Sequence, residues 1–187
     1  MDLVAYSQYY RTSSPERQLE IDECLRRNLN HPGISRMVLF CESDAPPVPE
    51  GTVPVEVVNS DERITYAEWF RWVQRQGSGI GLLLNAYIYL DEGLEHLAAS
   101  FNTPEAFLAL TRYNPGHAGF HLNDYPHWTQ DVWGVRADTE LPSHPQVRWI
   151  FIASYGTSGS AAVTIEIKRI ENDSCCTSQH AGALGQC

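Results

Sequence analysis

The sequence predicts an α/β fold in which a mostly parallel sheet is flanked by helices. Three observations favour this class. Strand-like and helical segments alternate through the first half of the chain. Residues 81–90 (GLLLNAYIYL) form a continuous apolar run, which is typical of a buried central strand in a parallel sheet. Two helix starts carry capping residues, Ser14 with Pro15 and Thr65 with Glu68.

The first strand is expected over residues 3–10 (LVAYSQYY), which are rich in aromatic and branched side chains. A helix follows, because Ile21, Leu25 and Leu29 repeat every four residues along one face. The tripeptide His-Pro-Gly at 31–33 ends that helix. The chain thus opens with a strand and an amphipathic helix.

The next segments continue the alternation. Residues 36–42 (RMVLFCE) form a short apolar run that closes on a carboxylate, and residues 45–54 form a proline-rich loop. A third strand is expected over 55–58. The capping box at 65–68 opens an aromatic helix that reaches about residue 76. This order of strands and helices favours a mostly parallel sheet that is covered by helices on both faces.

Beyond the apolar run, the pattern predicts a helix over 93–100 and a strand over 106–113. Residues 114–129 contain glycine, proline and histidine, and they are expected to form a loop. Residues 131–135 and 148–154 are further strand candidates.

The length of 187 residues suits one domain, expected over residues 1–171. Residues 172–187 are small and polar without periodicity, so we expect a disordered tail. The hydrophobic content of 43% and the aromatic content of 11% are typical of a folded globule. The net charge of −10 argues against nucleic acid and anionic membranes as partners, because both require a basic patch.

The cysteines and the N-terminus bear on the compartment. Five cysteines without a CxxC pair indicate neither a disulfide framework nor a zinc ribbon, and a reducing cytoplasm is the simplest location. The N-terminus lacks the basic region and apolar core of a signal peptide. No apolar run approaches the ~18–20 residues of a membrane-spanning helix, so no integral membrane segment is expected.

Three motifs suggest chemistry but have simpler explanations. The glycines of 77–81 (GSGIG) follow a helix and precede a strand, which reverses the order of the dinucleotide-binding fingerprint, so a turn is favoured. His117, His121 and His127 could bind zinc, but nearby glycines and proline disfavour the helix that would align them. The serine-rich run at 156–160 lacks the spacing of a nucleophile elbow, which disfavours a serine hydrolase.

Carboxylates stand at the edges of several apolar runs. Glu42, Asp91 and Asp131 each occupy such a position, where converging carboxylates could bind a divalent cation or provide a base. Helix caps and solvated turns explain any one of them equally well. Asp131 lies between Trp128 and Trp133, which predicts that it sits in a partly buried wall.

A series of short segments occurs in a definite order along the chain: QYY at 8–10, RQLE at 17–20, CL at 24–25 with Asn28, VLF at 38–40 with Glu42, RITY at 63–66, NAYIYLD at 85–91, LALTRY at 108–113 and TQDVW at 129–133. This ordered series resembles a family of bacterial and viral glycosyltransferase-like proteins, over about residues 3–135. The match lies in their order, since no single motif decides it.

The resemblance implies the A-type glycosyltransferase fold, with a Rossmann-like sheet, a nucleotide-sugar donor and a divalent metal, Mn or Mg, held by an acidic motif at a strand end. Asp91 matches the second acid of that motif and is the implied metal ligand. Tyr87 stands where the first acid is expected. A phenol, with a pKa near ~10, is a poor ligand for a hard cation, so this departure weakens metal-bridged diphosphate binding.

The resemblance also implies roles for polar residues. Asp131 would act as the catalytic group that orients or deprotonates an acceptor hydroxyl. Arg63 and Arg112 could offset the charge of a diphosphate. The residues implied in donor or substrate binding are Gln8, Arg63, Asn85, Arg112 and Gln130.

The function expected from the resemblance is sugar transfer from a nucleotide-sugar donor to a hydroxyl of a carbohydrate acceptor, in polysaccharide biosynthesis. Tyr87, Ala161 and Ala162 replace polar residues of the family pattern. These losses favour an alternative, a non-catalytic module that binds carbohydrate or nucleotide. A third alternative is an inactive fragment whose tail impairs folding.

Overall fold

A computed structural model describes residues 2–90, 94, 97, 101, 106–111 and 130–140 in full, and residues 113–116, 119–122, 148–154 and 164–170 as backbone strands. The expected single domain over 1–171 and the tail over 172–187 include residues outside these ranges. Both therefore stay predictions.

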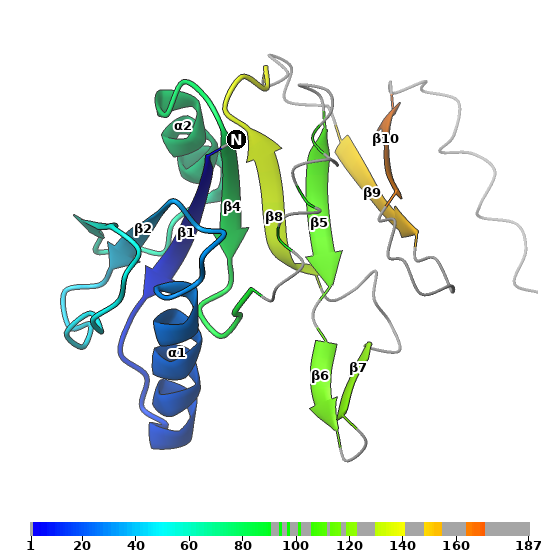
Figure 1. Cartoon of the computed structure of the whole chain (residues 1–187). Coiled ribbons are helices and arrows are strands. Elements are labelled where there is room, and N and C mark those ends of the chain that lie inside the picture. Colours follow the sequence, from blue (N-terminus) through cyan, green and yellow to red (C-terminus); the bar gives the residue numbers. More distant parts are fainter. Residues whose placement is uncertain are drawn as a thin grey trace, which may run out of the picture.

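A six-stranded sheet forms the centre of the molecule, in the order β3-β2-β1-β4-β8-β5 (Figure 1). β3, β2, β1 and β4 are mutually parallel, whereas β8 is antiparallel to both β4 and β5. The α/β class is confirmed, and the sheet is mostly parallel with one reversed strand. The strands are β1 (Leu3–Tyr9), β2 (Arg36–Cys41), β3 (Val55–Asn59), β4 (Ile80–Leu84), β5 (Phe107–Thr111) and β8 (Gln130–Arg136).

Two smaller sheets follow β5 and β8 in the chain. β6 (Tyr113–Gly116) pairs with β7 (Gly119–Leu122), and β9 (Arg148–Ser154) pairs with β10 (Thr164–Ile170). The prediction of a loop over 114–129 is therefore wrong over residues 114–116 and 119–122, where β6 and β7 pair as antiparallel strands, and its other residues lie outside the described ones. Glycine and proline also occur beside short strands, so composition alone could not separate a loop from a strand pair. β9 matches its prediction, while β10 was not predicted.

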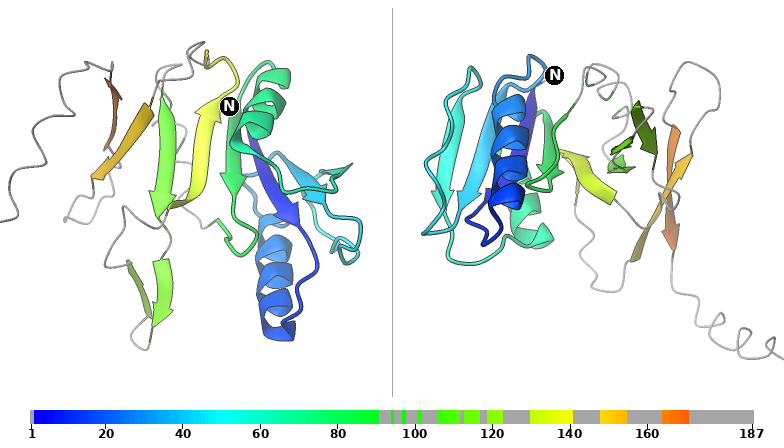
Figure 2. Two further views of the ribbon diagram at one scale, coloured as in Figure 1. Left: turned by 180° about the vertical axis from the view of Figure 1, so that it is seen from behind. Right: turned by 90° about the horizontal axis from the view of Figure 1, so that it is seen from below.

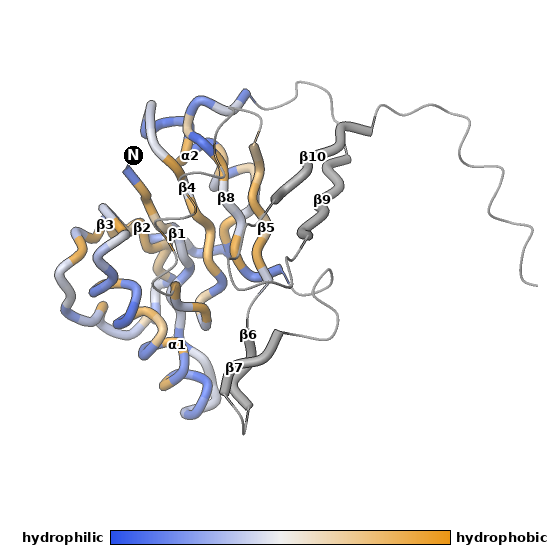
Figure 3. The backbone as a smooth tube through the Cα atoms, turned by 45° about the vertical axis from the view of Figure 1, so that its right-hand side comes forward, coloured by the Kyte–Doolittle hydropathy of each residue, from blue (hydrophilic) through white to orange (hydrophobic). Residues whose placement is uncertain are grey.

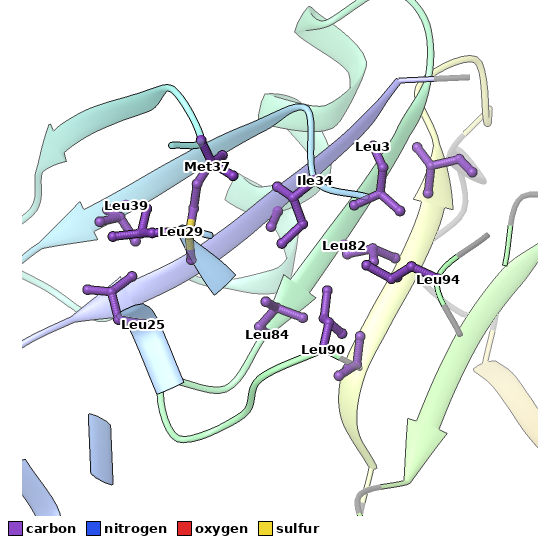
Figure 4. Close-up of a cluster of buried hydrophobic side chains, with 14 of the residues drawn as sticks. Leu3, Leu25, Leu29, Ile34, Met37, Leu39, Leu82, Leu84, Leu90 and Leu94 are labelled. Carbon is purple, nitrogen blue, oxygen red and sulfur yellow. The ribbon is translucent and has the colours of Figure 1, made fainter. Parts of the chain in front are cut away.

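Helix α1 (Pro15–Asn28) begins as the sequence predicts. The Ser14 hydroxyl accepts a hydrogen bond from the backbone N–H of Arg17 at 3.2 Å, and proline occupies the first turn. Ile21 and Leu25 are buried against the sheet. They join a core cluster on one face of the sheet, which is drawn in Figure 4.

Helix α2 (Tyr66–Arg75) covers the opposite face of the sheet (Figure 2). Its predicted capping box is confirmed, because Thr65 and Glu68 exchange both hydrogen bonds. Val73 packs over β4 at Gly81, where a Cβ atom would lie only 2.3 Å from Val73 Cγ2. Glycine at this position therefore permits the close approach of the helix to the strand.

The apolar run at 81–90 is a strand only in its first part. β4 ends at Leu84, and the backbone N–H of Ile88 bonds to the carbonyl of Asn85 at 3.0 Å, which turns the chain. The prediction of one strand through residue 90 is thus wrong. The run stays apolar after the turn because Leu90 packs into the same core cluster as Leu84 (Figure 4). Asn85, and not Asp91, is the residue that follows the strand.

The residues of the central strands, such as β4 and β5, are mostly hydrophobic (Figure 3). β1 is buried along its whole length, as expected for a central strand. Of the helix predicted over 93–100, only Leu94 and Leu97 lie within the described residues, and both are buried. Within the part of the chain that the structure describes, no helix has the length and apolar character needed to cross a membrane.

Candidate functional site

The strand order reverses at β1. The chain moves from β1 to β2 and β3 on one side and then returns through α2 to β4 on the other side, with α1 and α2 on opposite faces. In open α/β sheets, ligands bind in the crevice outside the carboxyl ends of the strands at such a reversal. The carboxyl ends of β1 and β4 are therefore the place where a site is expected.

Polar side chains line this edge on the β1 side. Gln8, near the end of β1, is 8% exposed, and its amide Nε2 donates to Glu42 Oε1 at 2.8 Å. The Ser7 hydroxyl donates to the carbonyl of Leu84 at 3.2 Å, which joins the ends of β1 and β4. An amide and a carboxylate thus lie in a fixed arrangement beside the reversal point.

Asp131 is the centre of the site on the β4 side. Its carboxylate Oδ1 accepts a hydrogen bond from Asn85 Nδ2 at 2.7 Å and another from the Tyr87 hydroxyl at 3.1 Å. The backbone N–H of Asn85 also bonds to the Asp131 carbonyl at 3.0 Å. Asp131 is only 4% exposed, so these bonds orient a buried carboxyl group.

The reversed direction of β8 explains why Asp131 reaches this edge. β8 pairs with β4 so that Val132 lies opposite Leu84, which places Asp131 opposite Asn85. Because the pair is antiparallel, the first residues of β8 lie beside the carboxyl end of β4. A parallel β8 would have carried Asp131 to the other end of the sheet.

Arg17 approaches the site from the first turn of α1. Its guanidinium lies over the Tyr87 ring, 4.0 Å from the ring centroid, and its Nη1 pairs with Glu20. Such a cation–π contact holds both side chains in place. The same helix makes a second contact of this kind, between Arg27 and Tyr89 at 4.4 Å. Two side chains of α1 therefore hold the segment that follows β4 against the helix.

Asn28 also holds this segment, through hydrogen bonds to its backbone. Its amide Nδ2 donates to the Ile88 carbonyl at 2.8 Å, and its Oδ1 accepts from the Leu90 N–H at 2.9 Å. The side chain is 2% exposed, so both bonds are shielded from water. We call this pair of bonds the Asn28 clamp. The clamp fixes the backbone on either side of residue 89 and so positions the segment that carries Tyr87.

The structure brings part of the predicted site together. Asn85 and Asp131 are in direct contact, Gln8 lies at the neighbouring strand end, and Gln130 precedes Asp131 at the start of β8. Arg63 is different. It is exposed between β3 and α2, and within the described residues no hydrogen bond connects it to Asn85 or Asp131. The predictions for Asp91 and Arg112 fall outside the described residues.

The ordered motifs include Arg17 and Asn28, but the sequence assigned neither of them a role at the site. Asn28 carried a signal, because it lies three residues after Leu25 on the apolar face of α1, where a polar side chain requires partners. The contact of Arg17 with Tyr87 could not be predicted, since the two residues are distant in sequence. Tyr87 was interpreted only as the loss of an acid, whereas it donates to Asp131.

A divalent metal does not fit the described residues of this edge. Among them, no three His, Cys, Asp or Glu side chains lie close enough to hold a metal ion. Asp131 Oδ1 already accepts two bonds from neutral donors, and the phenol of Tyr87 is a poor ligand for Mn or Mg. The predicted ligand Asp91 lies outside the described residues, so its role stays a prediction.

Cysteine chemistry is also disfavoured in the described part of the chain. Cys24 and Cys41 are buried free thiols. Burial raises the pKa of the Cys24 thiol to about 11, and it also raises the pKa of the Cys41 thiol. Both groups therefore stay protonated and unreactive near neutral pH.

The arrangement suits hydroxyl-rich ligands. Sugar hydroxyls both donate and accept hydrogen bonds, and the amides of Gln8 and Asn85 can do the same, while the Asp131 carboxylate accepts. A carboxylate oriented in this way can also take a proton from a bound hydroxyl. The edge thus has the groups needed for binding a carbohydrate and for one acid–base step.

Comparison with known proteins adds no assignment. No protein-family model matches the sequence, and no curated protein matches it either. The resemblance inferred from the ordered motifs therefore stays a prediction.

Proposed function

We propose that the protein transfers a sugar from a nucleotide-sugar donor to a hydroxyl group of a carbohydrate acceptor. The observation that carries this proposal is the contact between Asn85 and Asp131, with Gln8 at the neighbouring strand end, at the reversal point of a mostly parallel α/β sheet. The ordered motifs that resemble glycosyltransferase-like proteins support the same reaction, with the A-type fold as the finer form of the α/β class.

Asp131 is assigned the role of base. The acceptor hydroxyl oxygen attacks the anomeric carbon of the donor sugar, the bond from that carbon to the diphosphate breaks, and the hydroxyl proton passes to the Asp131 carboxylate. The nucleoside diphosphate leaves with the bonding electron pair. The hydrogen bonds from Asn85 and Tyr87 fix the direction in which the carboxylate faces.

The neighbouring amides are assigned to substrate binding. Gln8, Asn85 and Gln130 lie on three adjacent elements of the edge and offer donors and acceptors to sugar hydroxyls. Arg63 and Arg112 remain proposed partners of the diphosphate. A cytoplasmic location, which suits the free thiols of Cys24 and Cys41, is part of the same proposal.

One observation favours a second candidate, a non-catalytic module that binds carbohydrate or nucleotide. The Tyr87 hydroxyl and the Asn85 amide both donate to Asp131 Oδ1, so this oxygen is already engaged before any acceptor arrives. A module of this kind would bind ligand without turnover. Ligand binding to the native state alone raises the melting temperature, which gives the module a signature of its own.

Release of nucleoside diphosphate from a panel of uridine, guanosine and cytidine diphosphate-sugars tests the proposal. Asp131→Asn is expected to lower the transfer rate about 10²–10⁴-fold, the usual contribution of a general base. Asp22→Asn is the matched control, because Asp22 Oδ1 also accepts from a tyrosine hydroxyl and an amide, at 2.9 Å and 2.8 Å. The control is expected to keep the wild-type rate.

The outcomes separate the two candidates. Turnover that Asp131→Asn abolishes and Asp22→Asn retains supports transfer. A rise in melting temperature without turnover of any donor supports the binding module. Turnover that survives Asp131→Asn would remove Asp131 from the role of base.

A further inference from the structure

We propose that this edge binds its nucleotide-sugar without a divalent cation, with Tyr87 holding Asp131 in place of a metal ion and Arg17 facing the diphosphate. The inference rests on the proposed function and specifies how the same site would balance the charge of its donor. Three features of the described residues carry it.

The first feature is the bonding of Asp131. A hard cation requires several oxygen ligands around it, usually including ionised carboxylates. Here Asp131 Oδ1 is bonded to the Tyr87 hydroxyl at 3.1 Å and to Asn85 Nδ2 at 2.7 Å. Both donors are neutral and present hydrogen atoms to the oxygen, where a cation would need a free lone pair. The two side chains thus do the orienting that a bound metal would do.

The second feature is the restraint on Tyr87. The Asn28 clamp holds the backbone that follows Tyr87, at Ile88 and Leu90, through bonds of 2.8 Å and 2.9 Å. Arg17 covers the ring from the helix side. Moving Tyr87 aside to admit a cation would break its bond to Asp131 and the ring contact together. The position of the hydroxyl is therefore built into the fold.

The third feature is the placement of positive charge. A diphosphate is strongly anionic, and the edge already contains the carboxylates of Glu42 and Asp131. Among the described residues, Arg17 contacts the Asp131 cluster through the Tyr87 ring, and its side chain is 37% exposed. A guanidinium keeps its charge at all relevant pH values and has five N–H donors, of which Nη1 pairs with Glu20. It can bind phosphate oxygens in bidentate geometry.

Thermal melts of the full chain with the panel of diphosphate-sugars, in EDTA and in Mn²⁺, test the inference. The donor that raises the melting temperature is expected to do so equally in both buffers. Arg17→Gln is expected to lower the affinity for that donor by about tenfold or more. Arg26→Gln is the matched control, because Arg26 lies on the same helix and pairs with Glu23 at 2.8 Å in a similar way. It is expected to leave the affinity unchanged.

A second variant tests the metal alone. Tyr87→Asp places a carboxylate beside Asp131 and removes the neutral donor, which creates a pair of hard-cation ligands. Mn²⁺ alone is expected to raise the melting temperature of Tyr87→Asp and to leave that of the wild-type chain unchanged. If the variant does not fold, the wild-type comparison between EDTA and Mn²⁺ still decides the question.

The results distinguish the inference from the proposed function. A donor shift in the wild-type chain that requires Mn²⁺ would overturn the inference and leave the proposed function standing. Stabilisation of the wild-type chain by Mn²⁺ without nucleotide would also overturn it. No shift with any donor in either buffer would contradict both. An equal shift in EDTA and Mn²⁺ that Arg17→Gln weakens supports the inference.

Discussion

Two aspartates, Asp22 and Asp131, are held by the same chemistry in two regions of the molecule. Asp22 lies in the middle of α1, and its Oδ1 accepts from the Tyr9 hydroxyl at 2.9 Å and from Gln18 Nε2 at 2.8 Å. Tyr9 is the last residue of β1 and is almost fully buried. These bonds fasten the helix to the strand beneath it, which is a structural task.

Asp131 makes an equivalent pair of bonds at the carboxyl edge of the sheet. Its partners, Tyr87 and Asn85, lie on the segment that leaves β4 rather than on a helix. Neither the carboxylate nor its donors distinguish the two regions. The difference is the position of Asp131 beside the reversal of strand order, where α/β sheets bind ligands. Location in the fold, and not bonding chemistry, therefore indicates the site.

The largest expected effect comes from Asn28→Leu, which removes the support of the Asp131 region alone. The substitution leaves the Ile88 carbonyl and the Leu90 N–H without the Asn28 side chain, at a cost of about 2–4 kcal/mol in the free energy of unfolding. Urea denaturation would measure this loss. Binding of the nucleotide-sugar is expected to weaken as well, because Tyr87 is no longer positioned.

Asn30→Leu is the control for this prediction. Asn30 also donates its amide to a carbonyl, that of Arg26 at 2.8 Å, but the bond is exposed to water. The control is expected to change the free energy of unfolding by less than about 0.5 kcal/mol. Equal losses of unfolding free energy in both variants would show that the Asn28 clamp stabilises the fold no more than an exposed side-chain hydrogen bond does.

A smaller effect is expected from the two tyrosine hydroxyls, which provide a direct comparison of the regions. Tyr9→Phe is expected to reduce the free energy of unfolding by about 1–2 kcal/mol without changing ligand affinity, since its partner Asp22 is structural. Tyr87→Phe is expected to cost less stability but to weaken nucleotide-sugar binding about fivefold, because Asp131 loses an orienting donor. Denaturation and calorimetric titration would measure the two quantities. The comparison fails if both variants change the same quantity.

The smallest effect is expected at alkaline pH and concerns the Asp22 region. Burial, followed by the hydrogen bond to Asp22, raises the pKa of Tyr9 above its ordinary value. The unfolded chain therefore loses this proton first, so the stabilisation is complete below the ordinary tyrosine pKa near ~10 and is lost as pH rises above it. The urea midpoint should fall less steeply above this pH in Tyr9→Phe than in the wild-type chain. Identical slopes would contradict the raised pKa.

Local signals in the sequence predicted much of the fold. The cap at Ser14, the capping box at Thr65 and the apolar spacing of α1 are interactions between near neighbours, so the sequence reveals them directly. The end of β4 was predicted too late in the chain, because a buried turn can be as apolar as a strand. The reversed direction of β8 could not be predicted, because it depends on pairing with distant strands.

The candidate site likewise combines residues that the sequence predicted with contacts that only the structure shows. Asn85 and Asp131 were predicted from ordered motifs, and the structure places them in contact. The role of Tyr87 could not be predicted, because a tyrosine in a motif shows the loss of an acid but not the bond that replaces it. Arg17 and Asn28 belong to the ordered motifs, but their contacts with the segment after β4 depend on the packing of α1, and only the tertiary structure shows these contacts.

Hydrogen–deuterium exchange of the full chain, with and without the diphosphate-sugars, tests the central claim most directly. If the carboxyl edge is the binding site, one of these ligands will slow exchange in the peptides that contain Gln8, residues 85–90 and residues 130–131. Exchange in α2, which covers the face of the sheet opposite to α1, will not change. Protection confined to α2, or no protection by any donor, would contradict the account.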